Sequence, residues 1–517
     1  MENVIYVNCY ADPWLKVAQK LYDEYSYNPV YWIGYRSFDH SDESVVKSFP
    51  NVIYQDYIDG FRGVFPEIVN EWMSDYFIDI DFLRQFSSFE LQSMTMMDRL
   101  DPDQSSFNFM ERQRHYRNLI KRWSAVIDKL DVKMVISTIS PHRIYDYALY
   151  NLCKYRKITY IILEHTAFEG RFLIENDIFS IGDKFIEDYK RLENEKNCYY
   201  TIPDDIRNKF ERVKGDYNDA APSWMKTESK NEKKTSNVVK LAFEYIKRKS
   251  IRNIFGKDGL LDVGTDKYYK KKNFTLENSH FNSLQFFNLK RRTIKIVDEL
   301  KSYYESLTVS PNYNDKYVIV FLHYQPEDTT CPCGDIFVNQ NLCIEVLLKH
   351  LPEDCFVYVK EHPHQFLHHR QGSSCRTKEF YSDLIKNKRV KLIPTNINSF
   401  ELIDHSLAIT TITGTVGWES VVRQKPVILF GISWLENYKG VLRIKDEKSA
   451  AKIWDFIKDY RYDEHSLHAY LSAVGRNTYQ AYYYMATYKN EIGISEQQCV
   501  NNITNAIVNK AKETTNH

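Results

Sequence analysis

The chain has 517 residues, enough for about two or three domains with complete hydrophobic cores. Its 43% hydrophobic and 27% charged residues are typical of a globular protein, and its 69 basic and 69 acidic residues cancel, so the basic excess that favours nucleic-acid binding is missing. Met1 begins no basic segment with a long apolar core behind it, and no run reaches the roughly 18 apolar residues of a membrane span. We therefore expect a cytoplasmic protein that does not bind nucleic acid.

Short β-branched runs alternate with amphipathic helix patterns through the first 200 residues. Strands are expected at 4–7, 30–33, 52–54, 134–139 and 158–163, and helices at 13–25, 110–130 and 145–155. From residue 65 to residue 130 the pattern is helical and rich in aromatic residues. The alternation predicts a parallel α/β sheet, here a Rossmann-like domain with a helical insertion.

The periodicity weakens from about residue 200 to residue 312, where only residues 286–307 predict a helix. Basic residues outnumber their acidic neighbours between residues 240 and 272. A solvated face is one explanation of this excess. Peripheral contact with an anionic membrane surface or an acidic glycan is the other.

The second half repeats the alternation. Strands are expected at 317–322, 355–360, 390–393, 406–412 and 426–430, and helices at 338–350, 380–387, 418–423, 450–460 and 467–488. Two Rossmann-like halves that face a cleft, with terminal helices packed behind, form the GT-B glycosyltransferase layout, so α/β of this type is the expected fold class. We expect an N-terminal acceptor domain at 1–200, a basic insertion and linker helix at 201–312, a nucleotide-sugar domain at 313–460, and helices at 461–517 that pack back on the N-terminal domain.

The loop from Thr410 to Glu419 is rich in threonine and glycine and lies between a predicted strand and a predicted helix. Glycine lets the backbone approach a ligand, threonine adds hydroxyl groups, and a helix N-terminus favours an anion. The loop therefore predicts a phosphate site, although similar turns occur in loops that bind nothing.

Two further loops follow predicted strands of the same half. They are His323-Tyr324-Gln325-Pro326-Glu327 and Lys360-Glu361-His362-Pro363. Parallel strands end at one edge of their sheet, so all three loops should lie on one rim, where α/β sheets bind ligands. His362 can donate to a phosphate oxygen, whereas Lys360 either adds charge or faces solvent.

These motifs resemble the bacterial capsule and surface-polysaccharide glycosyltransferases that include Kdo and nonulosonic acid transferases. The resembling residues are His323 to Glu327 with Thr329, Thr330 and Gly334; Lys360 to Pro363; Thr411 to Glu419 with Lys425 and Pro426; Ser140 to His142 with Tyr145 to Tyr150; and Glu164 to Thr166 with Gly170 to Phe172. The resemblance covers roughly residues 134–172 and 317–430. It is closest to members that use CMP-activated acidic sugars of the sialic or pseudaminic type.

The resemblance implies transfer of such a sugar from its CMP form to a hydroxyl of a capsule or lipopolysaccharide glycan. It implies a nucleotide and phosphate site of His323, Gln325, Lys360, His362, Pro363, Thr411, Thr413, Gly414, Thr415 and Glu419. Many UDP- or GDP-sugar enzymes of this layout carry two glutamates eight positions apart, but here Val427 follows Glu419 at that spacing. This departure weakens a UDP-sugar interpretation.

Transfer needs a base for the acceptor hydroxyl, and we expect it from the N-terminal half. Glu164 and His142 follow predicted strands and are preferred as catalytic residues over Asp146, which falls inside a helix, and Glu169. Two structural alternatives stay open: Glu164 could pair with Arg171, and His142 could cap the next helix.

No cofactor is expected beyond the CMP-activated donor, and no aspartate motif demands a metal. Cys331-Pro332-Cys333 without a second cysteine pair is a weak metal signal. Three other functions stay open: a CDP-polyol teichoic acid polymerase, a nucleotide-sugar epimerase of the same fold, and a non-enzymatic glycan-binding protein.

Overall fold

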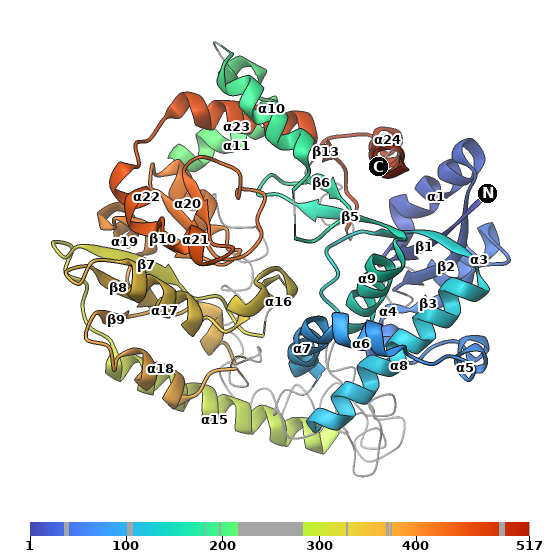
Figure 1. Cartoon of the computed structure of the whole chain (residues 1–517), viewed down its shortest axis with the longest axis horizontal. Helices are drawn as coiled ribbons and strands as arrows, with labels where there is room; N and C mark the ends of the chain where they lie inside the picture. Colours follow the sequence, from blue (N-terminus) through green and yellow to red (C-terminus); the bar gives the residue numbers. More distant parts are fainter. Residues whose placement is uncertain are drawn as a thin grey trace, which may run out of the picture.

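The computed structural model describes residues 1–35, 41–100, 107–179, 181–195, 198–215, 283–326, 329–368, 372, 375–484 and 492–515. Its strands form two sheets (Figure 1), one built from the N-terminal half together with a short strand near the C-terminus, and one built from the second half. The basic segment 240–272 lies outside the described residues. Among the described residues, no helix combines the length and apolar character needed to cross a bilayer.

The N-terminal sheet has seven strands in the order β13-β6-β5-β4-β1-β2-β3. They are β1 Glu2–Val7, β2 Tyr27–Gly34, β3 Ile53–Asp56, β4 Val132–Ser137, β5 Thr159–His165, β6 Arg171–Glu175 and β13 Tyr479–Gln480. Strands β1 to β5 are parallel, and β6 and β13 pair antiparallel. Residues 4 to 7 of the central strand β1 are fully buried, because side chains on both faces of the sheet are covered.

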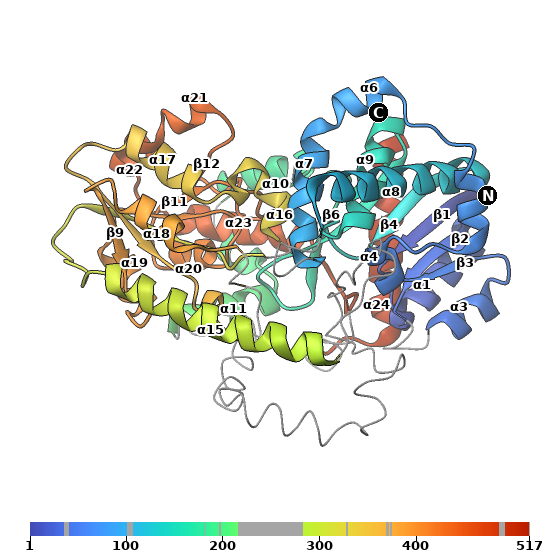
Figure 2. The same cartoon turned by 90° about the horizontal axis from the view of Figure 1, so that it is seen from below.

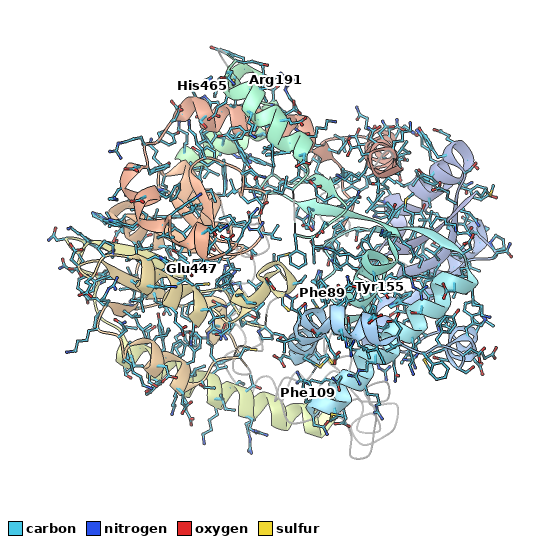
Figure 3. The ribbon with its side chains drawn as sticks, in the orientation of Figure 1. Phe89, Phe109, Tyr155, Arg191, Glu447 and His465 are labelled. Atoms are coloured by element: carbon cyan, nitrogen blue, oxygen red, sulfur yellow. The ribbon has the colours of Figure 1, made fainter. Side chains whose placement is uncertain are left out.

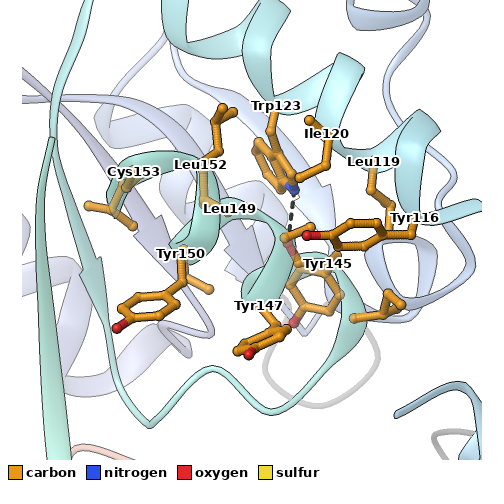
Figure 4. Packing of buried hydrophobic residues seen from close by; sticks show 14 of the residues in the cluster. Tyr116, Leu119, Ile120, Trp123, Tyr145, Tyr147, Leu149, Tyr150, Leu152 and Cys153 are labelled. Atoms are coloured by element: carbon orange, nitrogen blue, oxygen red, sulfur yellow. Dashed lines mark hydrogen bonds between the residues drawn. The ribbon is translucent and has the colours of Figure 1, made fainter. Parts of the chain in front are cut away.

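Helices cover both faces of this sheet. They are α1 Ala11–Tyr25, α3 Ser41–Ser48, α4 Tyr57–Arg62, α5 Glu67–Met73, α6 Ile80–Gln85, α7 Ser87–Met96, η1 Met97–Leu100, α8 Phe109–Lys129, α9 Ile144–Arg156 and α24 Glu496–Thr515. One face packs against α1, α3 and α24, and the other against α8, α9 and the helical insertion. Figure 4 shows α8 on α9, joined where Trp123 Nε1 donates to Tyr145 O at 2.9 Å.

The second sheet has six parallel strands in the order β12-β11-β10-β7-β8-β9. They are β7 Tyr317–Phe321, β8 Phe356–Lys360, β9 Val390–Ile393, β10 Ala408–Thr411, β11 Val427–Leu429 and β12 Val441–Arg443. The accompanying helices are α15 Ser283–Leu307, α16 Thr330–Cys333, η5 Asp335–Val338, α17 Asn341–His350, η6 Pro363–Phe366, α18 Lys378–Leu384, α19 Ser399–His405, α20 Val416–Val422, α21 Glu447–Ala450 and α22 Ile453–Asp459. Helix α15 runs along the underside of the molecule toward the N-terminal half (Figure 2).

A helical layer joins the two halves. It contains α10 Asp183–Glu193, η2 Cys198–Thr201, α11 Asp204–Gly215 and α23 Glu464–Asn477. Helices α10 and α23 lie side by side, with Arg191 and His465 at their outer ends (Figure 3), and His465 Nε2 lies 3.0 Å from Glu193 O. The layer shares one apolar cluster with β11 and α20, so it ties the N-terminal chain to the second sheet.

The two sheets confirm the predicted GT-B-like class of two Rossmann-like halves with a helical insertion and C-terminal helices. In each sheet, the first three strands in the chain run from the centre to one edge, and the later strands run from the centre to the opposite edge.

The helix predicted at 467–488 is wrong in its second half. Helix α23 ends at Asn477, and Tyr479 and Gln480 pair with β6 instead. Tyrosine-rich sequence is compatible with strand as well as helix, and the exposed edge of β6 decides between them. Of the helix predicted at 450–460, residues Ile453–Asp459 form α22, whereas Ala450 ends the separate helix α21.

Candidate functional site

The three polar loops of the second half lie on one rim of its sheet. Strands β10, β7 and β8 are neighbours, and His323, His362 and Thr413 each lie two residues beyond a strand end. The prediction that these loops share a rim is confirmed. Their contact with a nucleotide stays a prediction.

The His323 ring is bonded directly to the loop after β10. The amides of Ile412 and Thr413 donate to His323 Nε2 at 3.1 and 3.3 Å, and Thr411 Oγ1 lies 3.0 Å from the same nitrogen. A nitrogen that accepts from amides carries no hydrogen, so the neutral ring is protonated on Nδ1. The ring therefore joins two rim loops and is fixed in one tautomer.

Gly414 allows this close contact. A Cβ at this position would lie 2.8 Å from Thr411 Oγ1 and 3.1 Å from His323 Cε1. The Gly414 amide also donates to Thr411 Oγ1 at 3.1 Å. A side chain at position 414 would push the loop away from the His323 ring.

His362 begins the short helix η6 at the next strand end. Its Nδ1 accepts from the His364 amide at 3.1 Å, so the neutral ring is protonated on Nε2. The side chain is half-buried, and Pro363, the first residue of the helix, is exposed. The Nε2–H of His362 is a suitable donor to a phosphate oxygen.

Lys360 is tied to a neighbouring loop. Its Nζ donates to Ile397 O at 2.6 Å and to Ser399 Oγ at 2.8 Å. Burial lowers the pKa of its ammonium to about 8, because desolvation disfavours the charged form. Lys360 therefore fixes the segment before α19 in this structure.

The remaining predicted nucleotide residues differ in exposure. Gln325 is buried and donates to Thr330 Oγ1 at 2.6 Å, whereas Thr413 is half-buried and Thr415 is exposed. Thr415 Oγ1 donates to Glu419 Oε1 at 3.4 Å. Desolvation raises the pKa of the Glu419 carboxyl to about 7.

Two buried glutamines that the sequence did not single out support the loop after β7. Gln340 accepts from the His323 amide at 2.8 Å and donates to its carbonyl at 3.1 Å. Gln365 makes the same pair of bonds with Gln325, at 2.9 and 3.1 Å. Each side-chain amide acts as a strand partner for the loop, so the backbone is fixed although no strand continues there.

In the N-terminal half, His142 is buried. Its Nδ1 lies 2.8 Å from Ser140 O, and its carbonyl accepts from Arg99. Burial, together with the charges of Arg143 and Arg99, holds the pKa of the imidazole well below its usual value. Arg143, and not His142, is the N-cap residue of α9, so the capping alternative is wrong.

Asp146 is the partner of Arg143 in the capping box at the start of α9, and it is fully buried. Its carboxylate accepts from the Arg143 amide at 2.8 Å and from Asn8 Nδ2 at 3.2 Å. Burial raises its pKa to about 7. These bonds fix the end of β1 against the start of α9.

Glu164 lies near the end of β5 and is half-buried. Desolvation, followed by the charge of Glu175, raises the pKa of its carboxyl to about 8. The proposed ion pair with Arg171 is not formed, because Arg171 donates to both carboxylate oxygens of Asp205, at 2.5 and 2.8 Å. The structural alternative for Glu164 is therefore wrong.

Glu169, the other acidic candidate, pairs with Lys209 at 2.7 Å. Next to it, Phe168 reaches the second half, where its ring centroid lies 5.5 Å from those of Trp418 and Trp434. The hairpin of β5 and β6 therefore packs against α20, the helix that follows the threonine-rich loop. Glu164 comes four residues before this contact, so its strand end approaches the second half.

Cys331 and Cys333 are buried and are not joined in a disulfide. Within the described ranges, no group of three or more His, Cys, Asp or Glu side chains is arranged to hold a metal ion.

Residues 280–484 match the family described as capsule polysaccharide biosynthesis protein. No curated protein matches the chain. Solved structures that align with it include KpsC, a beta Kdo 2,4 transferase of Thermosulfurimonas dismutans, at 12% identity over 68% of this chain and 82% of that chain, with a TM-score of 0.28. A UDP-GlcNAc 2-epimerase of Methanocaldococcus jannaschii aligns at 13% identity over 90% of this chain and 94% of that chain, with a TM-score of 0.23.

The family match contains all three rim loops, from His323 to Glu419, and agrees with the resemblance of their motifs. Residues 280–484 are therefore similar to the capsule polysaccharide biosynthesis protein family in the part of the chain that carries the rim loops.

Proposed function

We propose that the protein is a glycosyltransferase that moves an acidic sugar from a CMP-activated donor to a hydroxyl of a bacterial surface glycan. The sugar would be a nonulosonic acid of the pseudaminic or sialic type, or Kdo. The observation that carries the proposal is the shared rim, where His323 is bonded to the amides of Ile412 and Thr413 and His362 begins the neighbouring loop.

The second half would bind the nucleotide and stabilise its phosphate as it leaves. His362 offers a ring N–H, and Thr413 and Thr415 offer hydroxyl groups on the accessible side of the loop. Hydrogen bonds from fixed donors stabilise charge that develops on a leaving phosphate. We propose that these donors act without a divalent metal.

The N-terminal half would supply the base. The acceptor oxygen attacks the anomeric carbon of the sugar, the bond from that carbon to the CMP phosphate oxygen breaks, and the hydroxyl proton passes to the base. Glu164 is the better candidate, because it is half-buried at a strand end and its pKa of about 8 suits proton transfer near neutral pH. His142 is buried and its low pKa makes it a weaker base.

The reaction would take place in the cytoplasm on a growing glycan. Peripheral contact with the inner face of the membrane through residues 240–272 is part of the proposal. Binding to vesicles of anionic lipid at low salt, which should weaken when several of these lysines are reversed, tests that part.

Incubation with a panel of CMP-, CDP- and UDP-activated compounds, with and without glycan acceptor, tests the function. CMP release that requires both a CMP-sugar and the acceptor would support the transferase. Interconversion of a UDP-sugar without acceptor would indicate an epimerase, and polymer formation from a CDP-polyol would indicate the teichoic acid polymerase. Failure to bind or turn over any nucleotide compound would leave a glycan-binding protein.

A further inference from the structure

A buried ion pair connects two of the rim loops. Glu361 and Arg376 have side-chain exposures of 0% and 3%, and Arg376 Nε donates to Glu361 Oε2 at 2.8 Å. Tyr381 donates to the same carboxylate oxygen at 2.7 Å. Neither member belongs to the predicted nucleotide site, and both are buried.

The pair links the backbones of the two rim histidines. Arg376 uses a second nitrogen, Nη2, to donate to His323 O at 3.1 Å. On the other side, Glu361 Oε1 accepts from the amide of His362 at 2.9 Å. A chain of hydrogen bonds thus runs from the loop after β7, through the guanidinium and the carboxylate, to the loop after β8.

Stability alone is a poor reason for such a pair. Removing two charges from water is costly, and a well-packed apolar pair of similar volume often stabilises a fold as well or better. What the pair adds is geometry, because the planar guanidinium fixes the directions of both of its bonds. The pair therefore contributes mainly to the relative placement of the two loops and little to the free energy of unfolding.

We propose that Glu361 and Arg376 are a positioning pair that holds His323 and His362 at the separation required to bind one phosphate group of a nucleotide. The inference rests on the proposed function for its ligand, but the link between the loops does not depend on that ligand. Neither residue needs to touch the nucleotide.

Arg376→Lys separates positioning from stability. Lysine keeps the charge and can still pair with Glu361, but one ammonium cannot reproduce the guanidinium fork that also reaches His323 O. We expect this variant to fold with a small fall in melting temperature and to bind CMP about 5- to 20-fold more weakly than the wild type. The Arg376→Met variant should lose both stability and affinity.

The opposite edge of the same sheet supplies a matched control. Asp315 accepts from Lys391 Nζ and from the Tyr358 hydroxyl, both at 2.6 Å, as Glu361 accepts from a cation and a tyrosine. Asp315→Asn and Glu361→Gln remove the same charge from a carboxylate that pairs with a cation and a tyrosine, although the Asp315 side chain is 14% exposed and that of Glu361 is 0% exposed. Both should lower the melting temperature, but only Glu361→Gln should weaken CMP binding.

Calorimetric titration with CMP and imidazole ¹⁵N spectra of ligand-free protein provide the two readouts. We expect the His323 Nε2 resonance to move in Arg376→Lys and not in Asp315→Asn. Unchanged CMP affinity and an unchanged His323 resonance in Arg376→Lys would overturn the inference. If the wild type does not bind CMP, the proposed function fails, and the His323 resonance alone then decides the positioning role.

Discussion

The two sheets share a central strand order, yet their carboxyl edges are built differently. In the second half, side chains bond to loop backbones: Gln340 and Arg376 hold His323, and its ring in turn holds the loop after β10. In the N-terminal half, the corresponding edge has polar bonds after β1, where Asn8 donates to Asp146, and aromatic rings after β2 and β3. Tyr35 and Tyr57, which follow β2 and β3, have centroids 4.5 Å apart. One topology therefore supports a rim fixed by polar bonds between its loops and a rim where aromatic packing supplements such bonds.

The difference also affects the ionisable groups. Burial raises the pKa of Asp146 to about 7 and of Glu164 to about 8, and it lowers that of His165 to about 4. All three shifts favour the neutral form. If the proposed function holds, the acceptor hydroxyl would meet these groups at the N-terminal rim, and the donors of the second rim would face the phosphate.

The largest expected effect comes from a substitution at the N-terminal rim. Glu164→Gln removes the proposed base, so kcat should fall by ~10²–10⁴-fold while CMP affinity stays nearly intact. Steady-state kinetics and calorimetry measure the two quantities. Near-normal turnover of a Glu164→Gln, His142→Ala double variant would remove both residues from the role and leave Asp146 or Glu169.

The next effect belongs to the phosphate side. His362→Ala and Thr413→Ala each remove a half-buried donor from the second rim, and each should weaken CMP binding by about 1–3 kcal/mol if it bonds to a charged phosphate. Turnover should fall with binding, in contrast to Glu164→Gln. Unchanged CMP affinity in both variants would place the phosphate elsewhere.

Gly414 and Gly417, three positions apart, test whether the close packing of the threonine-rich loop on His323 matters. Gly414→Ala would press a methyl group against Thr411 Oγ1 and the His323 ring, at a cost of about 1–3 kcal/mol in stability or nucleotide binding. Gly417→Ala is the control, because its Cβ would meet nothing closer than 3.5 Å and alanine favours helix α20. Equal effects of the two substitutions on melting temperature and CMP affinity would contradict this account of the loop.

The last prediction concerns the pH dependence of turnover and stability. A base with a pKa of about 8 must be deprotonated, so kcat should rise about tenfold per pH unit below that value and level off above it. The same shift affects stability, since the folded state retains a proton that the unfolded state loses above the ordinary value of 4.5. The wild type should therefore lose stability relative to Glu164→Gln as pH rises from about 5 to 8. A kcat that does not change over this range would count against Glu164 as the base.

Much of the framework could be predicted from the sequence, because buried parallel strands read as short apolar runs and their ends mark the rim. His323, His362 and Thr411 were found in this way. Gln340 and Arg376 were not, because each acts through a hydrogen bond to the distant residue His323, and no local spacing records such a contact.

Other features depend on tertiary pairing. Strand β13 has only two residues and forms because the edge of β6 is available, so the tyrosine-rich sequence after Asn477 predicted a helix instead. Arg171 illustrates the same limit for side chains. An ion pair with Glu164 was one alternative for Arg171, but the fold brings Asp205 to it.

The central claim is that the second rim binds the nucleotide phosphate, and a crystal structure of the protein with CMP tests it most directly. We expect the phosphate within hydrogen-bonding distance of His362 and the threonine-rich loop, next to His323, with the nucleoside on the same half of the chain. A phosphate bound at the N-terminal rim, beside Arg143 and Tyr57, would contradict the account.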